Sequence, residues 1–361
     1  MLYRIRQFDW ILVISALLLV GIGLLSLYSS SLGRGDFSSF QKQLVFAGIG
    51  IFLMFLLSFL DYRIFKNDRN LILVLYFLCI FGLAGLFFLA PEIRGVKSWY
   101  KIGQVSIDPA EFAKLALLLF LAKYFSLRHV ELYRIYHILV SGFYVLAPAA
   151  LVALQPNMGS ALILASLWLS ILVISGIRLK SFLAICFLGI IIFGLGWSFL
   201  LHDYQKERII GFVAPNADPL GISWSQNQAK IAIGSGGIFG QGFGKGSQTQ
   251  YGFLSEPQND FIFSAIAEEF GLAGVIVLFS IIIIMLSRII KIIIHSNSNF
   301  SSLFGAGFAV ILATQIFINI GMNLGLLPVI GVGLPFVSYG GSSLIVTFIG
   351  LGILQNIKKN Q

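Results

Sequence analysis

The sequence predicts an all-α, polytopic membrane protein with about ten transmembrane helices, organised as a single transmembrane domain over residues 1–361. Composition is the first observation behind this prediction. Hydrophobic residues make up 58% of the chain and charged residues only 11%, whereas a soluble domain averages about 25% charged residues. The second observation is that the apolar residues gather in runs of roughly 20, the length of helix that crosses a bilayer.

Ten apolar runs are candidates for membrane spans. They centre on residues 10–30, 43–60, 70–90, 109–126, 137–154, 159–177, 180–201, 261–287, 301–325 and 342–357. The first run follows Arg4 and Arg6, and no Ala-x-Ala cleavage site comes after it, so we expect a retained span and not a signal peptide. A loop of about 202–260 separates the seventh and eighth runs. Loops of that length are usually functional or disordered, and its Gly, Trp and Phe content argues against disorder.

The distribution of basic residues predicts the orientation of the chain. Ten spans place both termini on one side, together with 14 of the Lys and Arg residues, while nine lie on the opposite side. The positive-inside rule then makes the termini cytoplasmic and places the loops 91–108 and 202–260 outside. The same rule accounts for the net charge of +9 without a nucleic-acid partner. Cys79 and Cys186 lie in apolar runs without a CxxC motif, so neither a disulfide framework nor a zinc site is indicated.

Asp260 is the acidic residue for which we expect chemistry. It ends the 202–260 loop, directly before Phe261 and the eighth run. Asp is a preferred residue at a helix N-cap, and the residues alone favour a capping role and a functional role equally. A capping oxygen is less free to accept a proton, so the two interpretations partly exclude each other.

The fourth run begins with the signature of a helix N-terminus. Asp108 suits the N-cap, Pro109 the first position and Glu111 the third. Lys114 comes three residues after Glu111, so the two charges are neighbours on one helix face. The pair either neutralises itself inside the bundle or contacts a substrate, and the sequence leaves both alternatives open.

Polar residues also interrupt the eighth and ninth runs. Glu268 and Glu269 point about 100° apart on a helix, so at least one needs a partner or must stay protonated. We expect a structural role for one of them. Gln315, Asn319 and Asn323 recur every four residues and form one stripe, which either bonds across helices or lines a wet cavity.

A glycine-rich run at 234–246 invites a nucleotide-binding interpretation. It fails the Walker pattern, because Phe239 stands where the first Gly belongs and Gly246 replaces the required Ser or Thr. We expect a tightly turning extracellular loop whose backbone N–H groups cradle an anion such as a diphosphate.

Several segments together resemble the SEDS family of RodA, FtsW and SpoVE. They are PAEFAK at 109–114, QPNMGSA at 155–161, AIGSGG, GKG, SQTQ and DFIF within 224–274, NIGMNLGLLPV at 319–329 and LPFVSYGGSS at 334–343. These segments keep the order of the family and spread over nearly the whole chain. Departures from the family pattern are Gln258-Asn259 in place of His-Thr, Asn157 in place of Asp, and Ser98 in place of the Arg before Trp99.

The resemblance implies a peptidoglycan glycosyltransferase that polymerises lipid II at the outer face of the bacterial cytoplasmic membrane. It also implies a class B penicillin-binding protein as partner, in cell elongation and shape or in division; the short tails favour the RodA-like role. Asp260 corresponds to the essential Asp of the family. The substrate-binding residues that we expect are Lys97, Trp99, Glu111, Lys114, Lys245, Gln248 and Ser338.

Glycan growth from lipid II means that a sugar 4-hydroxyl attacks an anomeric carbon whose leaving group is a lipid diphosphate. Since a diphosphate leaves as a stable anion, one carboxylate base and nearby positive charge suffice, whereas a glycosidase needs two carboxyl groups. We expect Asp260 to remove the acceptor proton. Lys97, Lys114, Lys245 or a divalent cation (Mg²⁺ or Mn²⁺) would stabilise the diphosphate. No cluster of carboxylates marks a dedicated metal site, so no tightly bound cofactor is expected.

Two other classes of function remain as alternatives. A lipid flippase or transporter suits the ten spans, the polar stripe and the intramembrane charges, although the sequence shows no pair of interrupted helices in matching halves. A non-catalytic scaffold of the cell-wall machinery is the second alternative.

Overall fold

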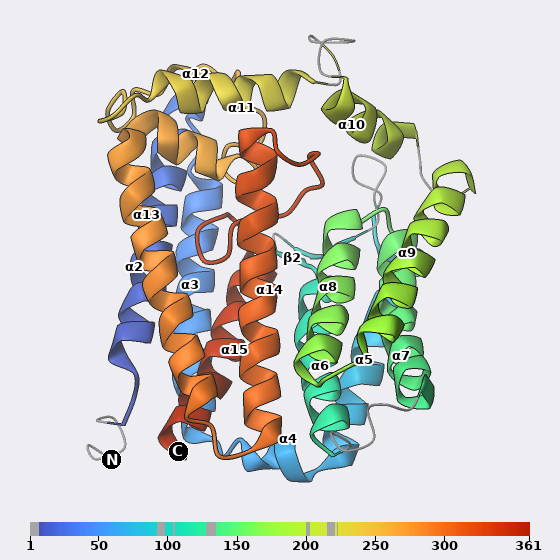
Figure 1. Ribbon diagram of the computed structural model, residues 1–361. Coiled ribbons are helices and arrows are strands. Elements are labelled where there is room, and N and C mark those ends of the chain that lie inside the picture. The colour runs from blue at the N-terminus through green and yellow to red at the C-terminus, as the bar shows by residue number, and fades with distance from the viewer. Residues whose placement is uncertain are drawn as a thin grey trace.

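The computed structural model describes residues 7–91, 98–103, 105–127, 135–199, 203–214, 221 and 223–361. Over these residues the protein is a bundle of long helices with shorter helices lying across one end (Figure 1). Ten long helices occupy the ten predicted runs. They are α2 (Trp10–Arg34), α3 (Ser38–Phe59), α5 (Arg69–Leu89), α6 (Pro109–Ser126), α7 (Ile135–Leu154), α8 (Met158–Ile174), α9 (Leu179–Phe199), α13 (Ile262–Ile294), α14 (Asn299–Leu324) and α15 (Gly341–Lys359). The predicted fold class is confirmed.

Eight of these described helices are long and apolar enough to cross a membrane, and α6 and α8 are the two outside that set. Helix α8 has only 17 residues, and α6 carries the three charged residues Glu111, Lys114 and Lys123. Helix α6 is nevertheless buried along nearly its whole length by neighbouring helices. A helix that contacts protein on all sides does not need a lipid-compatible surface, which is why its polar residues are tolerated.

The 202–260 loop is largely helical, which the sequence did not predict. It contains α10 (Asp203–Val213), α11 (Trp224–Ser235) and α12 (Ser247–Gln250), which lie across the bundle (Figure 1). A small antiparallel hairpin of β1 (Tyr100–Ile102) and β2 (Val105–Ile107) lies between α5 and α6 in the chain. The short helix α4 (Arg63–Asn67) lies at the opposite end, near the end of α15 (Figure 1).

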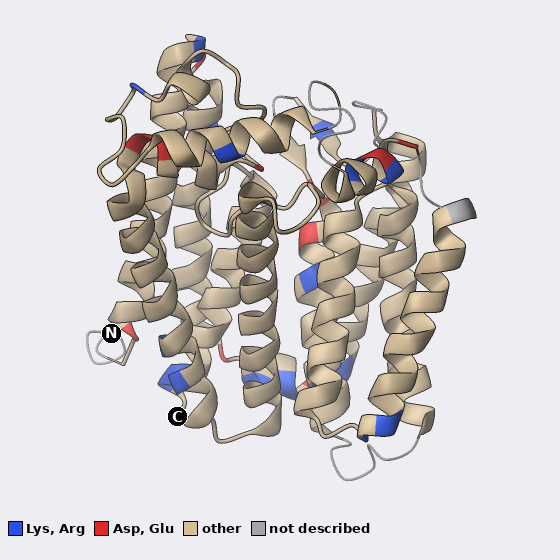
Figure 2. Ribbon diagram, turned by 45° about the horizontal axis from the view of Figure 1, so that its top comes forward, with Lys and Arg blue, Asp and Glu red and all other residues tan. Residues whose placement is uncertain are grey.

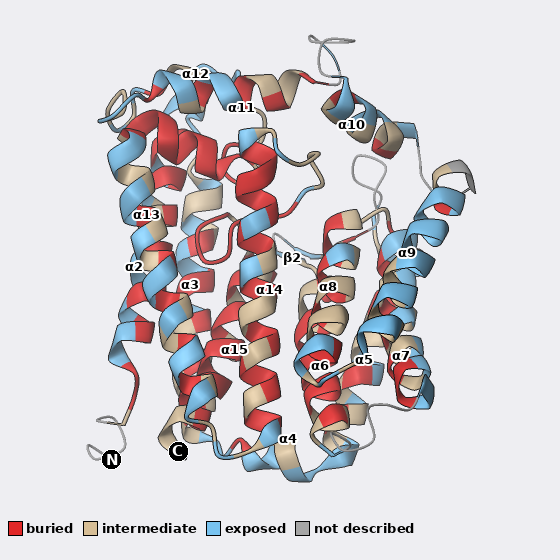
Figure 3. Cartoon of the chain, viewed as in Figure 1, coloured by how far each residue is buried: buried red, intermediate tan, exposed pale blue. Residues whose placement is uncertain are grey.

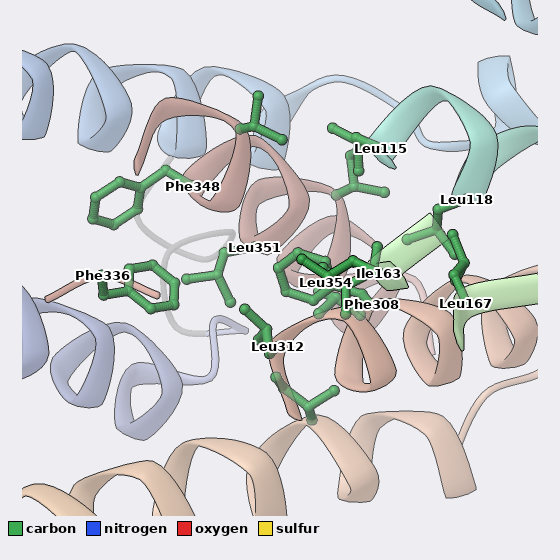
Figure 4. Packing of buried hydrophobic residues seen from close by; sticks show 14 of the residues in the cluster. Leu115, Leu118, Ile163, Leu167, Phe308, Leu312, Phe336, Phe348, Leu351 and Leu354 are labelled. Carbon is green, nitrogen blue, oxygen red and sulfur yellow. The ribbon is translucent and has the colours of Figure 1, made fainter. Parts of the chain in front are cut away.

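The core is built where α14 and α15 pack against α3, α6 and α8. Figure 4 shows side chains from α6, α8, α14 and α15 meeting in one cluster, among them Leu118, Leu167, Phe308 and Leu354. Because lipid is as apolar as these side chains, close packing and not water exclusion holds such helices together. A Cβ atom on Gly350 would lie 2.2 Å from the ring of Phe308, so glycine is what lets these two helices approach.

The distribution of charge and burial fits a protein embedded in a bilayer. Charged residues gather at the two ends of the bundle, and the middle is nearly free of them (Figure 2). Buried residues line the inward faces, while much of α9 is exposed (Figure 3). Helix α2 begins and α15 ends at the same end of the bundle, and α10 to α12 cover the other (Figure 1). The first and the last of the ten long helices therefore begin and end on one side, as an even number of spans predicts.

Candidate active site

Asp260 lies at the end of the bundle that α10 to α12 cover, directly before α13. Its side chain is half-buried. The residue at the N-cap of α13 is Phe261, and no side chain caps this helix. Among the described residues, no N–H or O–H group donates a hydrogen bond to the Asp260 carboxylate. The capping alternative is therefore not what the structure shows, and the carboxylate oxygens are free to accept a proton.

The main chain at Asp260 is held firmly by the polar stripe of α14. The side-chain amides of Asn319 and Asn323 donate to the carbonyl oxygen of Asp260 at 3.0 and 2.9 Å. Asn323 also accepts hydrogen bonds from the N–H and the hydroxyl of Ser264, at 3.1 and 2.6 Å. These two asparagines make hydrogen bonds between helices, which is one of the two alternatives that the sequence left open. They fix the position of the Asp260 main chain, from which the carboxylate extends.

Arg208, on α10, is the cation that acts on Asp260. Burial raises the pKa of the Asp260 carboxyl to about 6, against the opposing attraction of the Arg208 guanidinium, and the carboxylate of Glu256 adds to the rise. The Nη1 of Arg208 donates to the carbonyl oxygen of Val329 at 3.2 Å. Asp260 therefore has a higher affinity for a proton than an ordinary aspartate, next to a permanent positive charge.

Three loops meet around this pair of charges. A Cβ atom on Gly331 would lie 3.8 Å from Oδ2 of Asp260, which places the α14–α15 loop beside the carboxylate. A Cβ on Gly159 would lie 2.4 Å from Cγ2 of Val332, so the start of α8 packs against the same loop. The hydroxyl of Tyr204, on α10, donates to the carbonyl oxygen of Pro156 at 3.3 Å. Segments separated by more than a hundred residues thus form one site.

Ser338, one of the predicted substrate contacts, makes two hydrogen bonds within the protein. Its hydroxyl donates to the carbonyl oxygen of Asn259 at 2.7 Å and accepts from the N–H of Leu334 at 2.7 Å. The backbone N–H of Tyr339 donates to the carbonyl oxygen of Gln258 at 2.8 Å. Ser338 therefore joins the α14–α15 loop to the residues before Asp260, and its hydroxyl is already in use.

The two residues that depart from the family pattern before Asp260 also have partners. Gln258 donates through Nε2 to the hydroxyl of Ser30 at 3.1 Å. Asn259 donates through Nδ2 to the Glu256 carboxylate at 3.1 Å. Both side chains support the loop that carries Asp260.

The hairpin between α5 and α6 brings Trp99 to the same end of the bundle. Lys97 lies outside the described residues. Trp99 is partly buried, and its neighbour Ser98 donates to the carbonyl oxygen of Gln155 at 3.2 Å. The hydroxyl of Tyr100 donates to the carbonyl oxygen of Gly82 at 2.7 Å. These contacts anchor Trp99 beside the α7–α8 loop.

Glu111 and Lys114 form a close ion pair inside the bundle. Lys114 Nζ lies 2.7 Å from Glu111 Oε1, and the two side chains are only 3% and 15% exposed, for Lys114 and Glu111 respectively. Gln315 lines a cavity of about 20 Å³ beside this pair, which is room for about one water molecule. The third member of the polar stripe thus lines a cavity, unlike the two asparagines. The self-neutralised pair is what the structure shows.

The glycine run at 234–246 is bound to an interruption in α13. Gly271, with φ 65° and ψ −164°, breaks the helix. The N–H groups of Gln241 and Gly242 donate to the carbonyl oxygens of Glu268 and Glu269, at 2.9 and 3.0 Å. These two N–H groups satisfy the broken helix and are not available to an anion.

Glu268 and Glu269 are both structural, where the sequence predicted this role for one. Glu268 accepts from the N–H of Gln248 at 2.6 Å and from the N–H and hydroxyl of Thr249 at 3.0 and 2.7 Å. Glu269 accepts from the hydroxyl of Ser29 and from Gln250 Nε2. Hydrogen bonds to the carboxyl oxygens are what make such burial tolerable.

Two predicted substrate contacts, Lys245 and Gln248, lie in this second region. Lys245 is exposed on the glycine loop, and the Gln248 backbone is held by Glu268. No described contact joins either of them to Asp260. The structure therefore brings Trp99 and Ser338 to the site's end of the bundle, and places Lys245 and Gln248 over α2 and α13.

Sequence reasoning missed Arg208 and Glu256 as parts of the site. The signal for Arg208 was a dense group of charges at the start of the loop, namely Asp203, Lys206, Glu207 and Arg208. Within the described residues, no group of three or more His, Cys, Asp or Glu side chains lies close enough to hold a metal ion.

Comparisons with known proteins agree with this architecture. The family model of the FtsW/RodA/SpoVE cell cycle proteins matches residues 9–361. Stage V sporulation protein E of Bacillus subtilis (strain 168) is 35% identical over 363 residues, which cover 97% of each chain. Peptidoglycan glycosyltransferase MrdB of Escherichia coli (strain K12) is 34% identical over 322 residues, 89% of this chain and 86% of MrdB.

Solved structures extend the similarity to three dimensions. Rod shape determining protein RodA of Thermus thermophilus superposes with a TM-score of 0.73 at 30% identity, over 98% of this chain and 97% of RodA. A chain from a peptidoglycan synthase complex that coordinates polymerization and crosslinking superposes with a TM-score of 0.82 at 30% identity, over 98% of both chains. The chain belongs to the FtsW/RodA/SpoVE family of cell cycle proteins.

Proposed function

We propose that this chain is a peptidoglycan glycosyltransferase, which polymerises lipid II into glycan strands at the outer face of the bacterial cytoplasmic membrane. The observation that carries the proposal is the half-buried Asp260 carboxylate, which accepts no hydrogen bond from a described residue and lies near Arg208. Family membership supports it, since the similar MrdB is named a peptidoglycan glycosyltransferase.

In this proposal Asp260 acts as the general base. The 4-hydroxyl of one sugar forms a bond to the anomeric carbon of another, and the bond from that carbon to the lipid diphosphate breaks. Asp260 takes the proton of the hydroxyl, a contribution typically worth about 10²–10⁴-fold in rate. A pKa of about 6 leaves the carboxylate mostly ionised at neutral pH and makes it a stronger base than an ordinary aspartate.

Positive charge for the departing diphosphate comes from Arg208 in this proposal. A guanidinium is always charged and binds phosphate oxygens through two parallel N–H groups. Lys114 is less suited to this role than the sequence suggested, because Glu111 already neutralises it. Lys97 and Lys245 remain candidates for contacts with more distant parts of the substrate.

A divalent cation, Mg²⁺ or Mn²⁺, arrives with the diphosphate in this proposal. The carboxylates of Asp260 and Glu256 are near enough to repel each other, but Glu256 already accepts a hydrogen bond from Asn259. Two such carboxylates are too few for a dedicated metal site. They suit a divalent cation that is also bound by the phosphates of the substrate.

The orientation and the partner follow from the same proposal. The end of the bundle opposite Asp260 carries basic residues from several elements, among them Arg63, Lys66, Arg288 and Lys358, and this asymmetry favours cytoplasmic termini. A class B penicillin-binding protein is the partner we propose, since one similar chain comes from a peptidoglycan synthase complex. A RodA-like role in elongation and cell shape, in preference to division, completes the proposal.

The test is lipid II polymerisation by Asp260→Asn, purified with its partner and reconstituted in liposomes. We expect strand synthesis to fall by about 10²-fold or more, with an unchanged melting temperature. Asp203→Asn is the matched control, because Asp203 lies on α10 with its side chain 96% exposed. Near-normal synthesis by folded Asp260→Asn refutes the base assignment.

The same reconstitution separates the alternative functions. Lipid II supplied on the exposed leaflet needs no translocation, so polymer formation there supports the enzyme and its absence supports a flippase. A scaffold instead predicts that cells carrying Asp260→Ala grow normally and keep the partner bound.

A further inference from the structure

A second candidate site lies at the end of the bundle opposite Asp260. A cavity of about 390 Å³ opens there between three element ends. The end of α4 contributes Lys66, the end of α6 contributes Lys123 and Ser126, and the beginning of α14 contributes Ser298. Its size falls in the range of small-ligand pockets, about 300–1,000 Å³. None of its lining residues belongs to the candidate active site.

The cavity brings two ammonium groups together without a matching acid. Lys66 and Lys123 lie close enough to repel each other, and Nζ of Lys123 donates to the carbonyl oxygen of Lys66. No described carboxylate forms an ion pair with either lysine. The acidic group that acts on Lys123 is Asp68, whose Oδ1 already accepts from the N–H groups at the start of α5. An anion between the two lysines would relieve their repulsion.

The start of α14 adds to the positive potential on the third side. This helix has 26 residues, so its N-terminus carries the positive end of a full macrodipole. Ser298 caps it by accepting from the N–H of Ser301 at 3.3 Å. By its position in the first turn, the N–H of Phe300 has no acceptor within its own helix. Lysine ammonium groups and helix N-termini both suit phosphate oxygens.

We propose that this cavity binds a phosphate-type anion, supplied either by the headgroup of an anionic phospholipid or by a free phosphate. The cavity is larger than one phosphate group needs. Leu127 lies on its rim with 66% of its surface exposed, beside the end of α6. A phospholipid would place its phosphate between Lys66 and Lys123 and its glycerol and acyl carbons against Leu127.

The test measures lipid binding by the full chain in detergent micelles, with phosphatidylglycerol as the anionic probe and phosphatidylcholine as the zwitterionic reference of zero net charge. Native mass spectrometry counts the bound lipid. We expect preference for phosphatidylglycerol, weakened about tenfold by Lys66→Gln and by Lys123→Gln, since each removes a charged hydrogen-bond donor. Lys291→Gln is the matched control, because Lys291 is exposed on α13 at the same end and should bind as the unmodified protein does.

Two further measurements keep the outcome clear. Lys66→Arg keeps the positive charge and should keep the preference for phosphatidylglycerol. A loss of lipid binding that comes only from misfolding would instead appear as a lower melting temperature, and it would also affect this variant. Millimolar inorganic phosphate that displaces the lipid identifies a free phosphate as the ligand, whereas lipid retained under phosphate identifies the headgroup. Equal binding of both lipids, or an unchanged preference in both glutamine variants, overturns the proposal.

Discussion

The hydroxyl of Ser338 donates a hydrogen bond to the carbonyl oxygen of Asn259 across 2.7 Å, and so joins two segments 79 residues apart. Asn259 directly precedes Asp260, whose own carbonyl oxygen is held by two amides of α14. The main chain is therefore fixed at Asp260 and at the residue before it, while the carboxylate accepts no hydrogen bond from the described residues. This arrangement positions a base without consuming its oxygens.

Ser338→Ala should lower both the stability of the protein and its rate of polymerisation. The substitution leaves the carbonyl oxygen of Asn259 and the N–H of Leu334 without their partner, which costs about 1–3 kcal/mol. We expect a lower melting temperature and a reduced kcat for lipid II polymerisation. Ser343→Ala is the control, since the Ser343 hydroxyl makes no hydrogen bond with a described residue. A Ser338→Ala protein with unaltered melting temperature and kcat would show that this contact positions nothing.

The pH dependence of polymerisation should reveal the pKa of Asp260 and the influence of Arg208 on it. The base must be ionised, and its pKa lies at about 6, so the rate should fall about tenfold per unit below that pH. Arg208 stabilises the carboxylate and lowers its pKa. Arg208→Gln should therefore move the acidic limb to higher pH, measured as a profile of kcat/KM.

Lys206→Gln on the same helix serves as the control for this profile, because Lys206 pairs with the exposed Asp203 at 3.7 Å. An acidic limb at the same pH in Arg208→Gln and in the unmodified protein would remove Arg208 from the site.

A double-mutant cycle should separate the two roles of Glu111 and Lys114. Removing one partner of this buried pair strands a charge, at a cost of about 3–5 kcal/mol. Glu111→Gln and Lys114→Gln alone should each lower the melting temperature strongly, and the double variant should recover much of the loss. If activity recovers with stability, the pair is structural; if it stays low, the pair also contacts the substrate. A double variant as unstable as the sum of the two excludes the pairing itself.

Gly271→Ala should disrupt the junction between α13 and the glycine loop. Its backbone conformation is one that residues with a Cβ rarely adopt, and the added Cβ would lie 2.3 Å from the backbone nitrogen of Gly240. We expect a loss of at least about 2 kcal/mol in stability, measured by thermal unfolding in detergent. Gly189→Ala in α9, where a Cβ meets nothing within 4 Å, should be neutral. Equal stability of the two variants would contradict this account of the break.

The sequence predicted the spans well because a bilayer imposes a simple rule on composition. The fourth run was predicted at 109–126, and α6 has these bounds, since Asp108 and Pro109 mark its start through local chemistry: the Asp108 side chain accepts from the N–H of Ala110 at 2.8 Å. The helices within 202–260 were not predicted, because they lie at the membrane surface, where no long apolar run signals them.

The sequence by itself determined the fold class, the ten long helices and Asp260 as the acidic residue to examine. Hydropathy and capping act over a few neighbouring residues, which is why a local pattern predicts them. Folding in three dimensions decided the rest. Contacts between residues far apart in the chain bring the charge of Arg208 near Asp260. They also let two asparagines hold the backbone of Asp260 and Ser338 that of Asn259, and they join Glu268 and Glu269 to the loop. Such contacts follow from how helices pack, and no local pattern encodes them.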